Sequence, residues 1–146
     1  MWRLLRSLLL LFVGAVAGFA ASAAVIRSWL PSRGDETSDE LELVAVFDGI
    51  DLKSRSAAFR GGRVLAWFGG MSLDLGGATL APDARLDVRT LFGGVAIKVP
   101  ANCRVDAETT ALVGGIDVAV PDPDDPDAPV LVVRAASLFG GVSIRR

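Results

Sequence analysis

Histidine is absent from this 146-residue sequence, and cysteine occurs once, at Cys103. Without imidazole the chain cannot build a Ser-His-Asp triad, a His-ligated zinc or haem site, or a histidine pH switch. A single cysteine cannot form a disulfide within the chain, so no disulfide framework holds the fold together. The sequence also lacks a basic excess, because its net charge is −2. This balance argues against a partner made of nucleic acid.

Charge is missing from one long segment near the N-terminus. Leu8–Ile26 contains no charged residue, and it accounts for much of the 51% hydrophobic content of the chain. About 20 apolar residues in a helix cross the hydrocarbon core of a bilayer. Residues 1–30 are therefore predicted to form one transmembrane helix, in contact with lipid, which anchors a single-pass protein in the cell membrane. Arginines flank both ends of the segment, so the side of the membrane that holds the rest of the chain stays open.

A cleaved signal peptide is the alternative interpretation of the same segment. Leu8–Phe19 would then be its apolar region, and Ala21-Ser22-Ala23 would be the cleavage site. The uncleaved anchor is favoured because apolar character continues through Val25 and Ile26.

Small residues recur at helical spacing within the segment, at Gly14, Gly18 and Ser22. Such spacing lets two helices approach closely in lipid, which predicts a homodimer through this helix. Glycine and alanine are also common in any membrane span or signal peptide, and that is the competing explanation.

The next segment, residues 31–42, is polar and acidic (PSRGDETSDELE). It has too few apolar residues to bury, so it is predicted to be a flexible linker. Residues 43–146 are predicted to form the folded domain.

A short motif repeats through this domain at intervals of 21 to 26 residues: a large apolar residue, a pair of glycines (Asp48-Gly49 in the first copy) and a further apolar residue. Five copies predict a repeat architecture. The predicted core anchors are Phe47, Phe68, Phe92, Val113 and Phe139. The predicted corner glycines are Gly49, Gly69, Gly70, Gly93, Gly94, Gly114, Gly115, Gly140 and Gly141.

Apolar and polar residues alternate with period two on both sides of each glycine pair, as in half-buried strands. Phe92 and Val95 are both predicted to face inward although they are three residues apart. The two glycines between them must then absorb a change of phase, as a bulge or corner does. On this argument Gly94→Val unfolds the domain.

The fold class predicted from these repeats is all-β: a β-solenoid of the single-stranded β-helix type with about five coils, preceded by the transmembrane helix. A β-sandwich of short strands is the alternative. The strand Leu41–Phe47 and the charged end Arg145–Arg146 are the predicted caps of the solenoid.

The serial Phe-Gly-Gly motif resembles one bacterial family. It is carried by Trp67–Gly70, Leu91–Pro100 and Leu138–Ile144, among other segments. The family is the C-terminal domain of the LiaF-like membrane proteins of the response to cell-wall-active antibiotics. The resemblance implies a β-solenoid in a membrane protein that regulates envelope-stress signalling, typically by restraining a sensor histidine kinase. It implies no catalytic residues.

The remaining candidate sites have ordinary explanations. Cys103 is interpreted as an inert, small apolar residue in preference to a redox sensor. The loop Asp122–Asp127 is interpreted as solvated in preference to calcium-binding. Catalysis by carboxylates such as Asp74 and Asp117 is the weakest alternative. No catalytic, cofactor or metal site is predicted, and the function predicted is non-enzymatic protein–protein interaction with a sensor kinase or another envelope protein. An exported structural or ligand-binding solenoid is the alternative.

Overall fold

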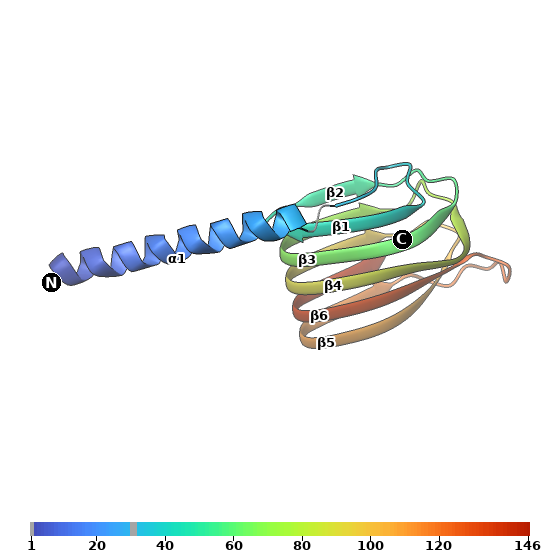
Figure 1. Cartoon of the computed structure of the whole chain (residues 1–146). Coiled ribbons are helices and arrows are strands. Elements are labelled where there is room, and N and C mark those ends of the chain that lie inside the picture. Colours follow the sequence, from blue (N-terminus) through green and yellow to red (C-terminus); the bar gives the residue numbers. More distant parts are fainter. Residues whose placement is uncertain (1, 30–31) are drawn as a thin grey trace. The chain divides into compact units, whose positions relative to one another are not determined.

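The computed structural model describes residues 2–29 and 32–146, apart from some side chains within the N-terminal helix. The chain divides into two compact units, Met1–Pro31 and Ser32–Arg146, and each is described separately. The first unit holds α1 (Trp2–Trp29), and the second holds every strand (Figure 1). The strands are β1 (Glu40–Val46), β2 (Ile50–Lys53), β3 (Phe59–Asp74), β4 (Leu80–Lys98), β5 (Arg104–Ala119) and β6 (Val130–Arg145).

The described large apolar side chains of α1, among them Leu8 and Phe12, are exposed. In the part of the chain that the structure describes, no helix meets the length and apolarity needed to span a membrane. Several residues of the expected span, including Val16 and Phe19, have side chains outside the described set. The hydroxyl of Ser22 donates to the carbonyl of Gly18 at 2.8 Å. The membrane anchor and the helix–helix contact stay predictions of the sequence.

All six strands belong to one sheet, and every neighbouring pair among them is parallel. β3, β4, β5 and β6 each bend at their glycine pair, so each forms two arms joined at a corner (Figure 1). β1 and β2 form a shorter layer of the same kind, because β1 pairs with the first arm of β3 and β2 with the second. This mostly β architecture fits a solenoid-like fold and excludes the two-sheet sandwich.

The core lies between the two arms of the stacked layers. Alternate residues of each arm face inward, as the period-two pattern predicts. The first arms contribute Leu86, Val88 and their register partners, and the second arms contribute Val95 and Ile97 and theirs. These four side chains are at most 2% exposed, and they belong to one continuous cluster.

The order of the layers differs from their order in the sequence. The sheet runs β1-β3-β4-β6-β5, so the C-terminal strand β6 inserts between β4 and β5. The prediction that Arg145–Arg146 caps the stack is therefore wrong, because these residues end an interior layer and β5 forms the end.

Side-chain chemistry explains this order. The inward residues of β6 include the large apolar side chains of Leu131, Val133 and Ile144, which gain more from a layer on each side than small side chains do, and all three are fully buried. β5 carries Ala107 and Thr109 at positions in register with Val133 and Ala135, and it lies at the edge. The hydroxyl of Thr90 on β4 also donates to that of Ser137 on β6 at 2.8 Å, in a buried pair that β5 cannot supply because it has alanine in register with Ser137.

The predicted linker 31–42 is another correction, because its described part belongs to the β unit. Arg33 forms an antiparallel bridge with Glu42, with backbone hydrogen bonds of 2.6 and 2.8 Å. Gly34 packs against the side chain of Leu41, which is 2% exposed. Hydrogen bonds from the Thr37 amide and hydroxyl and the Ser38 hydroxyl hold the pKa of Asp35 below its usual value. The segment 32–39 is thus an ordered cap over β1, called the N-terminal cap below.

The two glycines of each corner have different tasks. Gly93 has φ +154°, and a Cβ added to it would lie 2.0 Å from the carbonyl oxygen of Gly69 in the next layer. A side chain there would collide with backbone, which cannot move aside without parting the layers. Gly94 does not have a positive φ, and a Cβ on it would lie 3.8 Å from the Gly141 oxygen, an ordinary contact. The prediction that Gly94 itself must be glycine is therefore wrong, and the requirement falls on Gly93.

Paired alanine substitutions test this distinction. Gly93→Ala is expected to lower the free energy of unfolding by at least about 3 kcal/mol, because strain at φ and a backbone clash add together. Gly94→Ala is expected to change it by less than about 1 kcal/mol. Chemical denaturation of the full chain and both variants measures the difference. Equal effects at the two positions would contradict the account.

Candidate interaction surface at the glycine corners

Aromatic rings form a ladder along the outside of the corners. Phe47, Phe68, Phe92 and Phe139 stack face to face, with ring centroids 4.7, 4.8 and 5.0 Å apart and interplanar angles of 12° or less. Val113 is in register with Phe139 and continues the row on β5. The centroid spacing matches the separation of neighbouring strands, so the in-register pairing sets the stack. These five residues are called the corner ladder.

The corner ladder corrects the prediction that its members are core anchors. Phe47, Phe92, Val113 and Phe139 are between 41 and 53% exposed, and Phe68 is half-buried. The cause is the position of the phase change. Thr90 is buried and Phe92, two residues later, is exposed, so the chain changes face before the glycine pair and not within it.

The corner ladder ends in an apolar patch on β5. Leu112 is 71% exposed beside Val113, whereas its counterparts Leu91 and Leu138 are half-buried. Large exposed apolar residues that gather along one ridge mark sites of protein–protein contact more often than scattered ones do. Stacked rings also have little conformational freedom to lose on binding, which favours them as contact residues.

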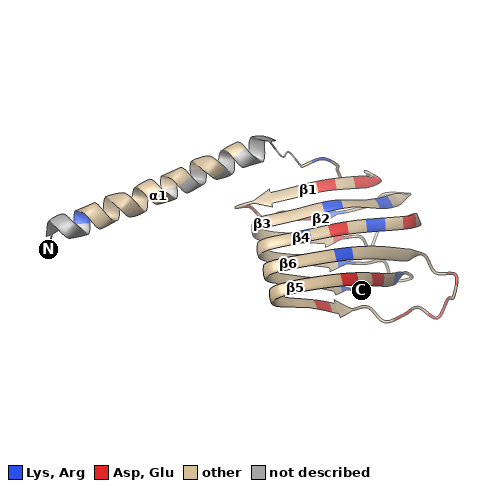
Figure 2. Ribbon diagram, turned by 60° about the horizontal axis from the view of Figure 1, so that its bottom comes forward, with Lys and Arg blue, Asp and Glu red and all other residues tan. Residues whose placement is uncertain are grey.

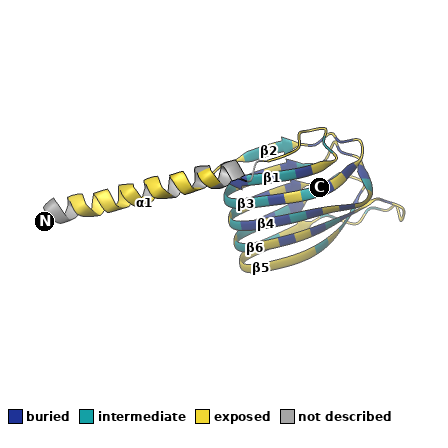
Figure 3. Ribbon diagram, viewed as in Figure 1, coloured by how far each residue is buried: buried dark blue, intermediate teal, exposed yellow. Residues whose placement is uncertain are grey.

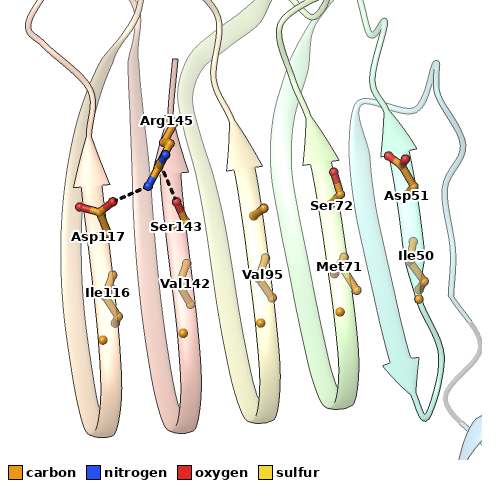
Figure 4. A pocket seen from close by; sticks show the side chains of 16 residues that line it. Ile50, Asp51, Met71, Ser72, Val95, Ile116, Asp117, Val142, Ser143 and Arg145 are labelled. Atoms are coloured by element: carbon orange, nitrogen blue, oxygen red, sulfur yellow. Dashed lines mark hydrogen bonds and ion pairs between the residues drawn. The ribbon is translucent and has the colours of Figure 1, made fainter.

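A shallow groove of about 920 Å³ lies next to the ladder, on the second arms (Figure 4). Its floor includes the second glycine of each corner, and the absence of a Cβ in this row makes the groove. The next outward row carries Asp51, Ser72, Ala96, Ser143 and Asp117 across the five layers. Most side chains in that row are small, so the groove stays open across the sheet.

The charged groups of the groove do not converge on one point. Asp51 and Asp117 lie at opposite ends of the row (Figure 4), and Asp74, the other carboxylate considered for catalysis, is not part of the lining. The guanidinium of Arg145 donates to Asp117 at 3.1 Å and to the hydroxyl of Ser143 at 3.1 Å. Arg145 was not predicted as a lining residue, because its place beside Asp117 depends on the strand order.

The remaining candidate residues lie apart from this surface. In the part of the chain that the structure describes, no group of three or more acidic, cysteine or histidine residues could hold a metal ion. In the acidic loop, Asp125 accepts the amide of Asp127 at 3.0 Å, and Asp122 lies 3.8 Å from Arg104. These contacts shape a turn at the surface.

Cys103 is fully buried, and its thiol donates to the Pro100 carbonyl at 3.3 Å. Desolvation raises the pKa of this thiol above its usual value of 9.0, and the positive charge of Arg146 opposes the shift. The thiolate is the reactive form, so the native thiol is disfavoured as a nucleophile.

We expect Cys103 to be unreactive toward a thiol reagent at pH 8 in the native chain and to react fully after denaturation. Because the thiol ionises more readily in the unfolded chain, stability should fall as the pH rises through and above 9. The reagent is one that releases a chromophore when it reacts with a thiol, so absorbance measures the reaction. The Cys103→Ser variant gives the background. Rapid reaction of the native chain would contradict the conclusion that the thiol of Cys103 is buried and protonated.

Comparisons with known proteins add little to this geometry. No family model matches the chain, and no curated protein matches it. One solved structure is similar, that of a candidate cell adhesion protein from Clostridium sporogenes, at 10% identity and a TM-score of 0.47. The similarity covers 64% of this chain and 57% of the other, so the chain spans less than two thirds of that protein. A likeness this distant carries no functional argument.

Proposed function

We propose that this chain is a non-enzymatic regulatory or scaffold protein of the bacterial cell-envelope stress response, anchored in the membrane and acting through protein–protein contact. The observation that carries the proposal is the corner ladder, whose aromatic rings are exposed or half-buried and are held in fixed register by the sheet. Aromatic residues, phenylalanine among them, are enriched at protein interfaces. A partner protein that packs on the ladder buries apolar surface and loses little entropy to order it.

The fold and the anchor belong to the same proposal. The β unit is a β-solenoid of five coils, supported by the repeated corner and by the parallel register of equivalent glycines, such as Gly69 with Gly93. α1 holds the chain at the membrane, supported by the uncharged stretch Leu8–Ile26.

The identity of the partner follows from the resemblance to LiaF-like proteins. The serial Phe-Gly-Gly motif that carries this resemblance also places the rings of the corner ladder. A sensor histidine kinase is therefore the proposed partner, with another envelope protein as the wider class.

An exported structural or ligand-binding solenoid is the second candidate. The groove on the second arms favours it, because its volume of about 920 Å³ falls in the range of small-molecule sites. In that case α1 is removed by signal peptidase near Ala23 and does not act as an anchor.

The fate of α1 separates the two candidates. A reporter active only outside the cytoplasm, fused after Arg146, gives the location of the β unit, and mass analysis of the mature chain gives its first residue. The anchored protein should retain Met1–Ile26 and fractionate with membranes. A mature chain that begins near Ala24 would replace the first candidate with the second.

The corner ladder gives a second test. In the host, deletion of the chain should change the output of a promoter induced by a cell-wall antibiotic by at least about tenfold, and the wild-type chain should restore it. Phe92→Ser with Phe139→Ser should fail to restore it, because the contact surface is lost. Ser72→Asn, an exposed change on the groove side, should restore it in full. Normal output after deletion would refute the regulatory role.

A further inference from the structure

The end of the stack at β5 is open. Among the described strands, β5 pairs with β6 alone, and most of its residues are exposed along its 16-residue length (Figure 3). Val118 faces the core side and is 41% exposed, whereas Ile144, its register partner on β6, is fully buried. The edge thus presents peptide groups that point away from β6, beside an uncovered end of the apolar core.

At the opposite end of the stack, the chain itself covers the edge of β1. In the N-terminal cap, Arg33 pairs antiparallel with Glu42 on β1, and Ser32 exchanges hydrogen bonds with the backbone of Val44 at 2.9 and 3.2 Å. Leu41 and Leu43 on β1 are at most 3% exposed. The chain therefore covers the edge of β1 with a short segment that carries a cation.

Charge alternates strand by strand across the outer face of the first arms (Figure 2). Each residue of this row is in register with the next, and together they form the charge row Glu42, Arg63, Asp87, Arg134 and Glu108. Arg33 of the cap extends the alternation at the first end, where it lies 4.0 Å from Glu42. The row therefore begins with a cation and stops at an anion.

Glu108 is the last member of the charge row, and one side of it has no strand among the described residues. Its carboxylate accepts a hydrogen bond from Arg134 at 2.9 Å, and its side chain is 64% exposed. A carboxylate has acceptor positions for a second cation. The alternation therefore defines the residue that fits the next position, a lysine or arginine.

We propose that β5 binds an extended segment of a partner protein, which adds to the sheet as a further strand and places a basic residue opposite Glu108. Backbone hydrogen bonds to the outer edge of β5 give affinity, and alternate small apolar residues of the segment cover the open core. The basic residue selects the register. This surface is separate from the corner ladder, so the inference goes beyond the proposed function and does not depend on it.

A second copy of the chain fits this edge less well. Pairing of β5 with β5 of another molecule brings Asp106, Glu108 and Asp117 of both copies to the same seam. Like charges across neighbouring strands oppose pairing. A basic strand from another protein meets the same carboxylates with complementary charge.

The chain itself supplies a probe for this site. β3 pairs in parallel with β1 so that Arg63 lies opposite Glu42, on the side of β1 that corresponds to the open side of β5. The probe is a fluorescent, end-capped peptide that copies Arg60–Trp67, called the basic peptide. The control is the same peptide with Arg63→Glu, called the acidic peptide. Fluorescence anisotropy measures binding to the full-length chain in detergent micelles, and hydrogen exchange locates the peptide.

We expect the basic peptide to bind and to slow exchange of β5 amides, and we expect the acidic peptide to bind about tenfold more weakly. Glu108→Arg in the protein should weaken binding of the basic peptide to a similar degree and restore binding of the acidic peptide. Glu108→Gln should give an intermediate loss. Asp51→Arg, an equal change of charge at the far end of the sheet, should leave both affinities unchanged.

Three results would overturn the proposal. One is no binding of the basic peptide up to about 1 mM by a folded chain. Another is binding that slows hydrogen exchange outside β5, or whose affinity changes with neither Arg63→Glu in the peptide nor Glu108→Arg in the protein. The third is protection of β5 that grows with protein concentration in the absence of peptide, which would assign the edge to a second copy. Melting of each variant confirms that it is folded.

Discussion

Close approach of backbone to backbone at the corners is the constraint on which the structure depends. The carbonyl oxygen of Gly69 occupies the space that a side chain on Gly93 would need, and the other first glycines of the corners meet their neighbours in the same way. This contact sets each layer directly on the next. Parallel register follows from it, and with register come the stacked rings of the corner ladder and the aligned charges of the charge row. Substitutions that separate neighbouring layers at the corners should therefore disturb the corner ladder and the charge row at the same time.

The order of the strands has consequences for both ends of the stack. Because β6 lies between β4 and β5, the interior is complete only when the last residues of the chain have inserted. Contacts so distant in sequence close slowly, since the loop entropy is lost before they form. The same order leaves β5 at the edge with its core side uncovered, while the N-terminal cap protects β1. A row of charges that alternates between these ends gives the open edge a preference for one kind of strand.

Sequence reasoning predicted the local structure well and the placement of the strands poorly. Period-two alternation identified inward residues such as Leu86 and Ile97, and the repeats indicated a solenoid-like β fold, which the single parallel sheet fits. The outward position of Phe92 was missed because alternation alone does not reveal where the phase changes. The inserted β6 was missed because strand order depends on pairwise contacts such as Thr90 with Ser137. An acidic composition concealed the N-terminal cap, whose order comes from hydrogen bonds to β1.

Cross-linking of layers tests the strand order most directly, in a chain that carries Cys103→Ser. Thr90→Cys with Ser137→Cys places two thiols on adjacent strands, within the range of a disulfide. Thr90→Cys with Ala111→Cys places them two strands apart, at about 9.6 Å, which is beyond that range. The account predicts that mild oxidation joins the first pair and leaves the second free, as judged by mass after cleavage between the cysteines. A disulfide in the second pair and none in the first would mean that the layers follow their order in the sequence. That result would contradict the open edge of β5.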